Sequence, residues 1–306
     1  MSLGRDNATW CHRAGTRAQG EWDCVIDQRL PGWAHTGLRT ATLTPGASLD
    51  LALTDHEAVV VPLSGGLGVE VFDADRVEVF ELAGRPDVFA GPTDVLHVPA
   101  GGRLRLVGSG TTDTRVALCL ARVEAPSGRR PVHLAAKDVP VELRGAGAAT
   151  REVRNFGVPG VLDAERIIAC EVITPAGNWS SWPPHKHDEE RAGVESELEE
   201  IYWFQTRSTG EPGSDAVGYQ RVYGTDDRPI DVLAEVRTGD VVLVPHGWHG
   251  PAMAAPDADL YYLNVMAGPG PERAWRICDD PAHAAVRATW AGQPLDPRLP
   301  LGGPTA

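Results

Sequence analysis

Two histidines stand two positions apart in "SSWPPHKHDEE", residues 180–190. On a β-strand, residues i and i+2 point to the same side of the sheet. His185 and His187 can therefore aim both imidazoles at one point, while Lys186 between them points away. The two prolines before them favour an extended backbone. Because imidazole is a common ligand of divalent metals, this spacing indicates a metal site.

Further donors follow in the same half of the chain. The sequence "LEEIYWF" carries two adjacent carboxylates, and strand alternation places only one of them on the side of the histidines. The sequence "VPHGWHGP" carries His246 and His249 on a turn that leaves a strand. Imidazoles with one carboxylate and no thiolate suit a first-row divalent ion and exclude a zinc finger or a copper(I) site. An HxH pair alone is more often a surface feature, so the interpretation depends on these later donors.

Short β-strands must position these residues. Runs such as "EAVVVPLS", "LGVEVFD" and "TRVALCLARV" recur at intervals of roughly ten residues, which is typical of β-sandwiches and barrels. A second series begins at "RIIACEVIT" and ends at "DLYYLNVMAG". Only "PAHAAVRATW", residues 281–290, has a helix-like pattern. The fold class predicted from these patterns is all-β.

The two series indicate two β-barrels in tandem. Each contains a strand that ends in a turn of similar chemistry, "PTDVLHVPAGG" in the first series and "TGDVVLVPHGWHG" in the second. This is a weak internal repeat. The intervening sequence is rich in Pro, Gly, Arg and Ala. We therefore expect an N-terminal barrel at residues 1–125, a linker region at 126–153 and a C-terminal barrel at 154–306.

Composition limits the partners of the chain. Its 306 residues carry a formal net charge of −14, which argues against nucleic acid and anionic membranes because phosphate contacts need a basic face. No apolar run is long enough to span a membrane, and the N-terminus lacks a secretory pattern. The five cysteines show no CxxC or disulfide spacing, so a cytoplasmic protein with reduced thiols is expected. A homo-oligomer is compatible with the sequence.

Longer strings carry a family resemblance. The HxH pair, the carboxylate before an apolar strand and "GDVVLVPHGWHGP" resemble the two metal motifs of the cupin superfamily. Together with "TPAGNWSSWPPHKHD", "QRVYGTDDRPID" and "YYLNVMAGP", they resemble the 5-deoxy-glucuronate isomerase family of myo-inositol catabolism, whose members are bicupins. The resemblance is specific over residues 154–275 and fainter over the first half. It implies two tandem cupin barrels, that is, double-stranded β-helix or jelly-roll folds.

The resemblance also implies an activity. It is that of a metal-dependent aldose–ketose isomerase, an intramolecular oxidoreductase that converts 5-deoxy-D-glucuronate to 2-deoxy-5-keto-D-gluconate. One divalent ion, zinc or manganese, would be the cofactor, and a uronate-type sugar acid the small-molecule partner. The implied ligands are His185, His187, Glu200 and His249. Glu200 is chosen over Glu199 because the ligand glutamate of cupins directly precedes the first apolar residue of the strand.

The sequence does not identify the general base of the reaction. Moving a carbonyl from C1 to C2 requires either proton transfer through an enediol or a hydride shift beside a Lewis acid. Tyr202, Tyr223, Tyr262 and Glu199 are candidates for the base, and the sequence does not select among them. Alternation along the strand from Glu200 places Tyr202 on the interior side of the barrel.

A local cation must hold the substrate carboxylate, because the chain as a whole is acidic. Arg221 in "GYQRVYG" is the first choice, since Tyr219 and Tyr223 share its face and would form a sugar-binding wall. Arg154 and Arg273 are the next candidates.

Three alternatives remain open. The first is the related 4-deoxy-L-threo-5-hexosulose-uronate ketol-isomerase of pectin breakdown, and the second is an iron dioxygenase, because three imidazoles and a carboxylate also suit ferrous iron. The third is a sugar-sensing cupin without catalysis, for which the sequence offers no DNA-binding helix pair or basic patch. The histidines of the first half (His12, His35, His56 and His97) stand singly, so the first barrel is expected to be a metal-free packing partner.

Overall fold

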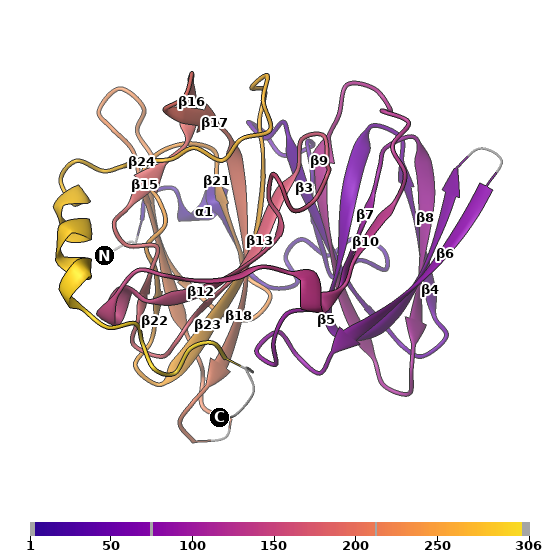
Figure 1. The fold of residues 1–306 in the computed structure, drawn as a ribbon, viewed down its shortest axis with the longest axis horizontal. Helices are drawn as coiled ribbons and strands as arrows, with labels where there is room; N and C mark the ends of the chain where they lie inside the picture. Colours follow the sequence, from indigo (N-terminus) through magenta and orange to yellow (C-terminus); the bar gives the residue numbers. More distant parts are fainter. Residues whose placement is uncertain (1–3, 74–75, 212, 302–306) are drawn as a thin grey trace.

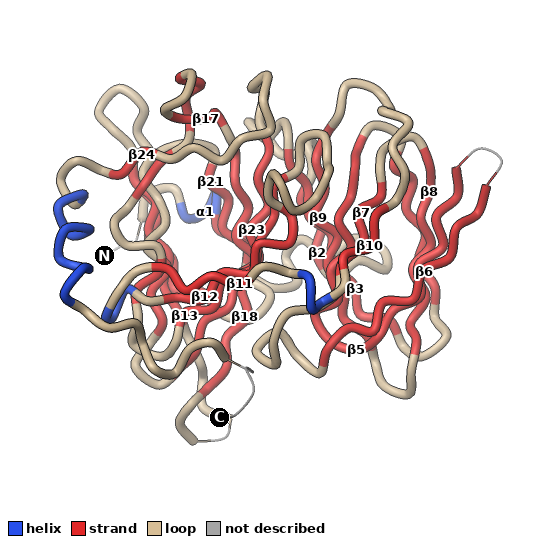
Figure 2. The backbone as a smooth tube through the Cα atoms, viewed as in Figure 1, coloured by secondary structure: helices blue, strands red, loops and turns tan. Residues whose placement is uncertain are grey.

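The chain is described by a computed structural model that covers residues 4–73, 76–211 and 213–301. Two β-barrels lie side by side, and strands dominate both (Figures 1 and 2). This confirms the predicted all-β class. The helical elements of these ranges are α1 (Asn7–Trp10) and the 3₁₀ helices η1 (Ala136–Asp138), η2 (Gly147–Ala149) and η3 (Ala284–Gly292). The segment predicted as helix-like, residues 281–290, overlaps η3. None of the described helices is long and apolar enough to cross a membrane.

The first barrel is one antiparallel sheet that curls on itself. Its strands are β2 (Cys24–Ile26), β3 (Thr36–Leu43), β4 (Ser48–Leu53), β5 (His56–Asp73), β6 (Arg76–Arg85), β7 (Val95–Val98), β8 (Gly102–Ser109), β9 (Thr114–Arg122) and β10 (Val132–Leu134). Strand β5 belongs to both walls, because it pairs first with β7 and β9 and then with β6 and β8. Register shifts near Ser64 and Gly65, where Gly65 has a φ of 78°, allow the strand to turn between the walls.

The second barrel has a large and a small wall. The large wall follows the order β1 (Cys11–His12), β21 (Val241–Val244), β18 (Glu199–Ser208), β23 (Ala258–Ala267), β13 (Ile168–Thr174), β12 (Arg151–Gly157) and β11 (Val141–Arg144). The small wall follows the order β14 (Trp179–Ser180), β22 (Ala252–Ala254), β19 (Gly218–Tyr223) and β20 (Asp231–Val236). Two short pairs complete the barrel, β15 (His185–Lys186) with β24 (Cys278–Asp279) and β16 (Asp188–Arg191) with β17 (Glu195–Glu197).

The barrels do not follow the chain as simply as the expected ranges do. The N-terminal segment crosses to the second barrel, where β1 pairs with β21 and the Asp6 N–H donates to the Asp231 carbonyl. The expected linker contains β10, which pairs with β7 of the first barrel, and β11, which pairs with β12 of the second. These strands of two to four residues are too short to show a period in the sequence.

Both faces of the large wall are buried. Ile201 and Trp203 pack in a core cluster that also contains Cys119 of the first barrel. Their neighbours Tyr202 and Phe204 pack in a different cluster, inside the second barrel. Since successive residues of a strand point to opposite faces, the same strands both join the barrels and line the interior of the second one.

A buried ionic cluster reinforces the joint between the barrels. Glu171 on β13 is 1% exposed and forms an ion pair with Arg85 of the first barrel. The Tyr261 hydroxyl donates to Glu171 over 2.7 Å, and Arg154 Nη1 lies 3.7 Å from the same carboxylate. Glu171, Tyr261 and Arg154 thus face the first barrel, and their neighbours in sequence, Val172, Tyr262 and Val153, face the interior of the second barrel.

Candidate metal centre

Backbone pairing brings the two histidine motifs together. The N–H of His185 donates to the carbonyl of His249 over 2.9 Å, and the N–H of His249 donates back over 2.8 Å. A second link joins His187 to the strand that carries the glutamates, because the Leu198 N–H donates to the His187 carbonyl over 2.9 Å. Leu198 lies two residues before Glu200, so the three segments meet at one point.

The side chains converge as a set of nitrogen and oxygen donors. His185, His187 and His249 are at most 6% exposed, and one nitrogen of each lies within 4.8 Å of the others. The Nε2 atoms of His187 and His249 are 3.0 Å apart. Oε2 of Glu200 lies 3.1 Å from the first nitrogen and 3.0 Å from the second. The four residues named from the sequence as ligands are therefore close together in the structure.

The outer ring nitrogens fix the orientation of two imidazoles. Nδ1 of His187 lies 3.1 Å from the Leu198 carbonyl, and Nδ1 of His249 lies 2.8 Å from the Gly247 carbonyl. A carbonyl only accepts, so each Nδ1 carries a hydrogen, and in the neutral form of each ring Nε2 keeps the lone pair that can bind a metal ion. Two lone pairs 3.0 Å apart repel unless a proton or a cation lies between them. The donor set thus fits a divalent ion.

The local electrostatics agree with this fit. Burial holds the pKa of His185 well below its usual range, and positive charge on His249 and His187 adds to the effect, so His185 is neutral. Burial alone would raise the pKa of Glu200, but hydrogen bonds from His187 and His249 lower it to about 2. The neutral His185 and the ionised Glu200 are in the protonation states that metal ligation requires. Burial opposes it, but the hydrogen bond and charge of Glu200 raise the pKa of His187, so a binding metal ion would displace a proton there.

Glycines in the second motif allow the close approach of its backbone. Gly250 has a φ of 110°, and a Cβ there would lie 2.8 Å from the His185 ring. Gly247 has a φ of 93°, and a Cβ there would lie 2.7 Å from the Tyr223 carbonyl. Larger residues at either position would displace the turn that presents His249.

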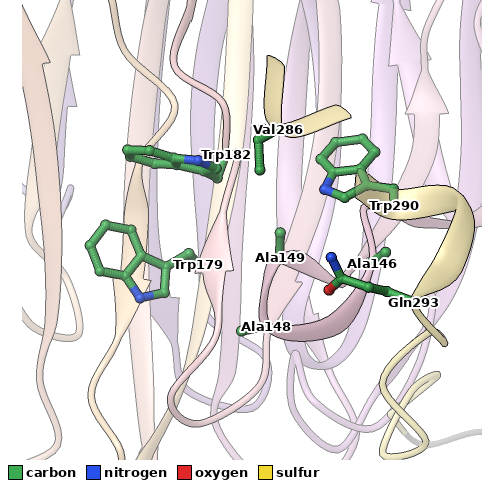
Figure 3. A pocket seen from close by; sticks show the side chains of 8 residues that line it. All are labelled: Ala146, Ala148, Ala149, Trp179, Trp182, Val286, Trp290 and Gln293. Carbon is green, nitrogen blue, oxygen red and sulfur yellow. The ribbon is translucent and has the colours of Figure 1, made fainter. Parts of the chain in front are cut away.

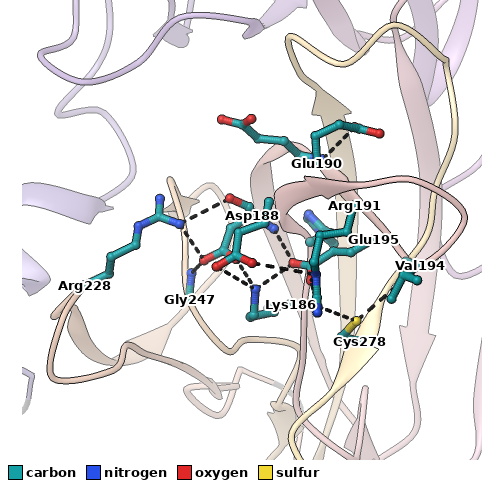
Figure 4. Close-up of polar contacts among 12 residues, drawn as sticks. Lys186, Asp188, Glu190, Arg191, Val194, Glu195, Arg228, Gly247 and Cys278 are labelled. Atoms are coloured by element: carbon teal, nitrogen blue, oxygen red, sulfur yellow. Dashed lines mark hydrogen bonds and ion pairs between the residues drawn. The ribbon is translucent and has the colours of Figure 1, made fainter.

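A charged network outside the centre ties the same segments together (Figure 4). As predicted, Lys186 points away from the histidines, and its partly buried side chain forms ion pairs. Its Nζ lies 2.6 Å from Asp188 and 2.8 Å from Glu195. Asp188 in turn accepts the N–H of Gly247 over 2.8 Å. The network therefore links the HxH segment to the turn before His249.

A small cavity of about 40 Å³ lies beside His185 and Glu200. Tyr202 and Tyr262, two of the three tyrosines named as candidates for the base, line it. Burial raises the pKa of Tyr262 to about 12, and burial with the nearby charge of Glu200 raises the pKa of Tyr202 well above its usual value. The Tyr262 hydroxyl is 2.7 Å from Ser180 Oγ. Both phenols therefore keep their protons at neutral pH.

The residues expected to bind the substrate on β19 lie elsewhere. Tyr219, Arg221 and Tyr223 share one face as predicted, but it is the outer face, because Gln220 and Val222 are the fully buried residues of this strand. Arg221 forms an ion pair with Asp231, Tyr219 donates to Glu235 and Tyr223 to Asp280. Alternation shows which residues share a face, but it does not show which face is inner.

The other predicted cations also have structural partners. Arg154 is fully buried at the joint between the barrels, where it donates to the carbonyls of Val88 and Gly91 and pairs with Glu152. Arg273 donates to three backbone carbonyls, of Gly157, Leu162 and Ile167, over 2.6 to 2.7 Å. Neither arginine lines the cavity beside the histidines.

Glu199, His246 and His97 lie outside the cluster of His185, His187 and His249. Glu199 accepts N–H groups of Ala34 and Thr36 and so joins the N-terminal half to β18. His246 is half-buried outside the cluster of three histidines. His97 of the first barrel is buried, 2.9 Å from Glu57. In the described ranges, the cluster in the second barrel is the one group of this kind.

Three arginines that sequence reasoning missed line the cavity: Arg144, Arg151 and Arg287. Arg151 and Val153 lie on the face of β12 that points into the second barrel, whereas Arg154 lies on the opposite face. Parity alone could not have identified Arg151, because Val153 on its face and Phe156 on the face of Arg154 are both apolar and buried.

An apolar depression adjoins this cavity. Trp179, Trp182 and Trp290 line it together with Val286, between η2 and η3 (Figure 3). Trp179 is 43% exposed. Helix η3 thus lines the depression with Val286 and Trp290, and its Arg287 lines the cavity beside the histidines.

Comparisons with known proteins cover both barrels. A family model described as the KduI/IolB family matches residues 10–286. A 5-deoxy-glucuronate isomerase of Geobacillus kaustophilus is 41% identical over 255 residues, which are 82% of this chain and 86% of the relative. A 5-deoxy-glucuronate isomerase of Listeria innocua is 39% identical over 265 residues, which are 84% of this chain and 89% of the relative.

Solved structures share the architecture. An IolB-like protein from Salmonella typhimurium LT2 aligns with a TM-score of 0.79 and 30% identity, covering 91% of this chain and 99% of that one. An oxalate decarboxylase from Lactobacillus farciminis aligns with a TM-score of 0.61 and 13% identity over 88% of each chain, a likeness of fold alone. The matched family region includes the converging histidines, Glu200 and the residues that line the cavity beside them, except Arg287.

Proposed function

Because the chain belongs to the KduI/IolB family and is an isomerase like its curated relatives, we propose that it converts 5-deoxy-D-glucuronate to 2-deoxy-5-keto-D-gluconate in inositol catabolism. We further propose that the reaction depends on one divalent ion, zinc or manganese. The observation that supports metal dependence is the pair of imidazole lone pairs that face each other at 3.0 Å beside an ionised carboxylate. The proposed compartment is the cytoplasm.

His185, His187, Glu200 and His249 are the proposed ligands. A divalent ion held there would polarise the substrate carbonyl and hold the adjacent hydroxyl. The surrounding residues exclude bulk water from the centre, since each ligand is at most 6% exposed. The contacts from Leu198 and Gly247 hold the rings in place before a substrate arrives.

The two cavity tyrosines supply protons rather than accept them. Isomerisation removes the C2 proton, places a hydrogen on C1, and turns the C1 carbonyl into a hydroxyl while the C2 hydroxyl becomes a carbonyl. Tyr202 and Tyr262 hold their phenolic protons at neutral pH because burial raises both pKa values. Each can therefore donate a hydrogen bond to a substrate oxygen that gains negative charge. Tyr223, at the outer surface, is less suited to this role.

The test is a coupled assay of the purified protein with 5-deoxy-D-glucuronate, with and without a chelator. Turnover that stops on chelation and returns with zinc or manganese is expected. Parallel assays use 4-deoxy-L-threo-5-hexosulose uronate as the substrate and follow oxygen consumption. Preferred turnover of that uronate, or consumption of oxygen, would contradict the proposal in favour of one of the alternatives.

A further inference from the structure

Arg151 has a buried charge without a counter-charge. The residue is 6% exposed, and its Nε is buried without a hydrogen-bond partner. Its one hydrogen bond among the described residues is a long one, from Nη1 to the Ala149 carbonyl at 3.4 Å. Burial lowers the pKa of Arg151 to about 10, so the group is still a cation at neutral pH. A buried unpaired charge destabilises a folded chain.

The other two arginines of the cavity do not share this property. Arg144 pairs with Glu142 over 2.8 Å, and Arg287 pairs with Asp279. Both of them are also partly exposed. Of the three arginines that line the cavity, Arg151 is thus the one without a carboxylate partner. It lines the same cavity as His185 and Glu200.

We propose that Arg151 binds the carboxylate of the substrate, with the reacting end of the same molecule at the histidine cluster. The inference rests on the proposed function, because it assumes a sugar acid in this cavity. A guanidinium presents a planar fork that matches a carboxylate with two parallel hydrogen bonds. Such a pair would give the buried Nε a hydrogen-bond acceptor and would neutralise the charge of the guanidinium. The carboxylate of the substrate is therefore the counter-charge of Arg151.

The experiment compares two probes on the metal-loaded protein by calorimetry. D-Glucuronate carries the carboxylate, and D-glucuronamide is its neutral counterpart of the same shape. The variants are Arg151→Met and Arg151→Lys. The control is Arg39→Met, which removes an arginine of the first barrel that also has a buried Nε without a partner.

Arg151→Met is expected to weaken D-glucuronate binding by about thirty-fold or more and to change D-glucuronamide binding by less than about three-fold. Arg151→Lys should restore part of the loss, because a point charge cannot reproduce the fork. Metal content should equal that of the wild type, and the melting temperature should not fall, because an unpaired buried charge has been removed. Arg39→Met should bind both probes as the wild type does.

Three results would overturn the inference. The first is that Arg151→Met loses equal affinity for D-glucuronate and D-glucuronamide. The second is that this variant loses metal or has a lower melting temperature, and the third is that the wild type does not bind D-glucuronate more tightly than D-glucuronamide. These results are independent of turnover. If the wild type fails to isomerise 5-deoxy-D-glucuronate but loses its preference for the anionic probe on Arg151→Met, the proposed function is wrong and the role of Arg151 stands.

Discussion

Asp188→Asn tests whether the charged network outside the histidine cluster positions the ligands. Asp188 is 7% exposed at its side chain and Lys186 is 13% exposed, so solvent screens their contact little. The substitution keeps the shape of the side chain but removes its charge. Its amide oxygen can still accept the N–H of Gly247, but its NH2 group would face the Lys186 ammonium.

The expected loss follows from these contacts. A hydrogen bond to a charged group contributes about 1.5–3 kcal/mol, and Lys186 keeps its contact with Glu195 at 2.8 Å. We therefore expect Asp188→Asn to lower the free energy of unfolding by about 2–3 kcal/mol. The network joins Lys186, between the HxH histidines, to Gly247, two residues before His249. Metal affinity should consequently fall by about 10- to 100-fold.

Urea denaturation of the metal-free protein measures the first effect, and competition with a chelator measures the second. Asp215→Asn is the control, because Asp215 is 68% exposed in its pair with Arg237 and such pairs contribute at most about 1 kcal/mol. The reasoning is refuted if Asp188→Asn matches this control in stability and binds metal within about two-fold of the wild type.

Three further measurements test other parts of the structure. Alanine at His185, His187 or His249 should each abolish most of the bound metal in elemental analysis, whereas His246→Ala should retain it. Glu171→Gln should lower the unfolding free energy by about 3–5 kcal/mol at neutral pH, because it leaves the buried Arg85 unpaired. Burial raises the pKa of Glu171, but the charge and hydrogen bond of Arg85 lower it below its usual value. The ionised Glu171 therefore stabilises the fold above the unfolded pKa of about 4.3, and this stabilisation is lost as the pH falls. The denaturation curves of wild type and variant should consequently converge in acid. Gln220→Leu should raise the melting temperature, because both amide atoms of Gln220 are buried without a partner and their removal gains about 1–3 kcal/mol; a lower melting temperature would contradict this.

Local patterns in the sequence indicated much of the histidine cluster that could hold a metal ion. The spacing of His185 and His187, and the parity that links Glu200 to Tyr202, are properties of a single strand and can be counted along the chain. The convergence of His249 with them depends on a backbone bridge to His185, and only the family resemblance could supply it. The predicted all-β class rested equally on local periodicity.

The arginines expected to bind the substrate lie away from the cavity beside the histidines, because a local pattern does not show which face of a strand is the inner one. Both faces of β12 are buried, so the alternation of polar and apolar residues that marks an inner face is missing there. Arg154 and Arg151 then look alike in sequence, although one faces the first barrel and the other the cavity. On β19 the residue that points into the barrel is polar, Gln220, and the aromatic residues Tyr219 and Tyr223 point outward. The sequence pattern therefore favoured the wrong face of this strand as the inner one. Pairing between distant strands, which sets these faces, leaves no local signal.

The large wall of the second barrel makes the chain indivisible. A fragment starting at residue 154 would leave Ile201, Trp203 and Leu263 on a bare apolar face that the first barrel now covers. The same cut would strip β1 from the edge of β21 and leave that edge open to pairing with other chains. Excision of the C-terminal half should therefore give an insoluble product. The repeat in the sequence suggests two modules, but the shared sheet makes them a single cooperative unit.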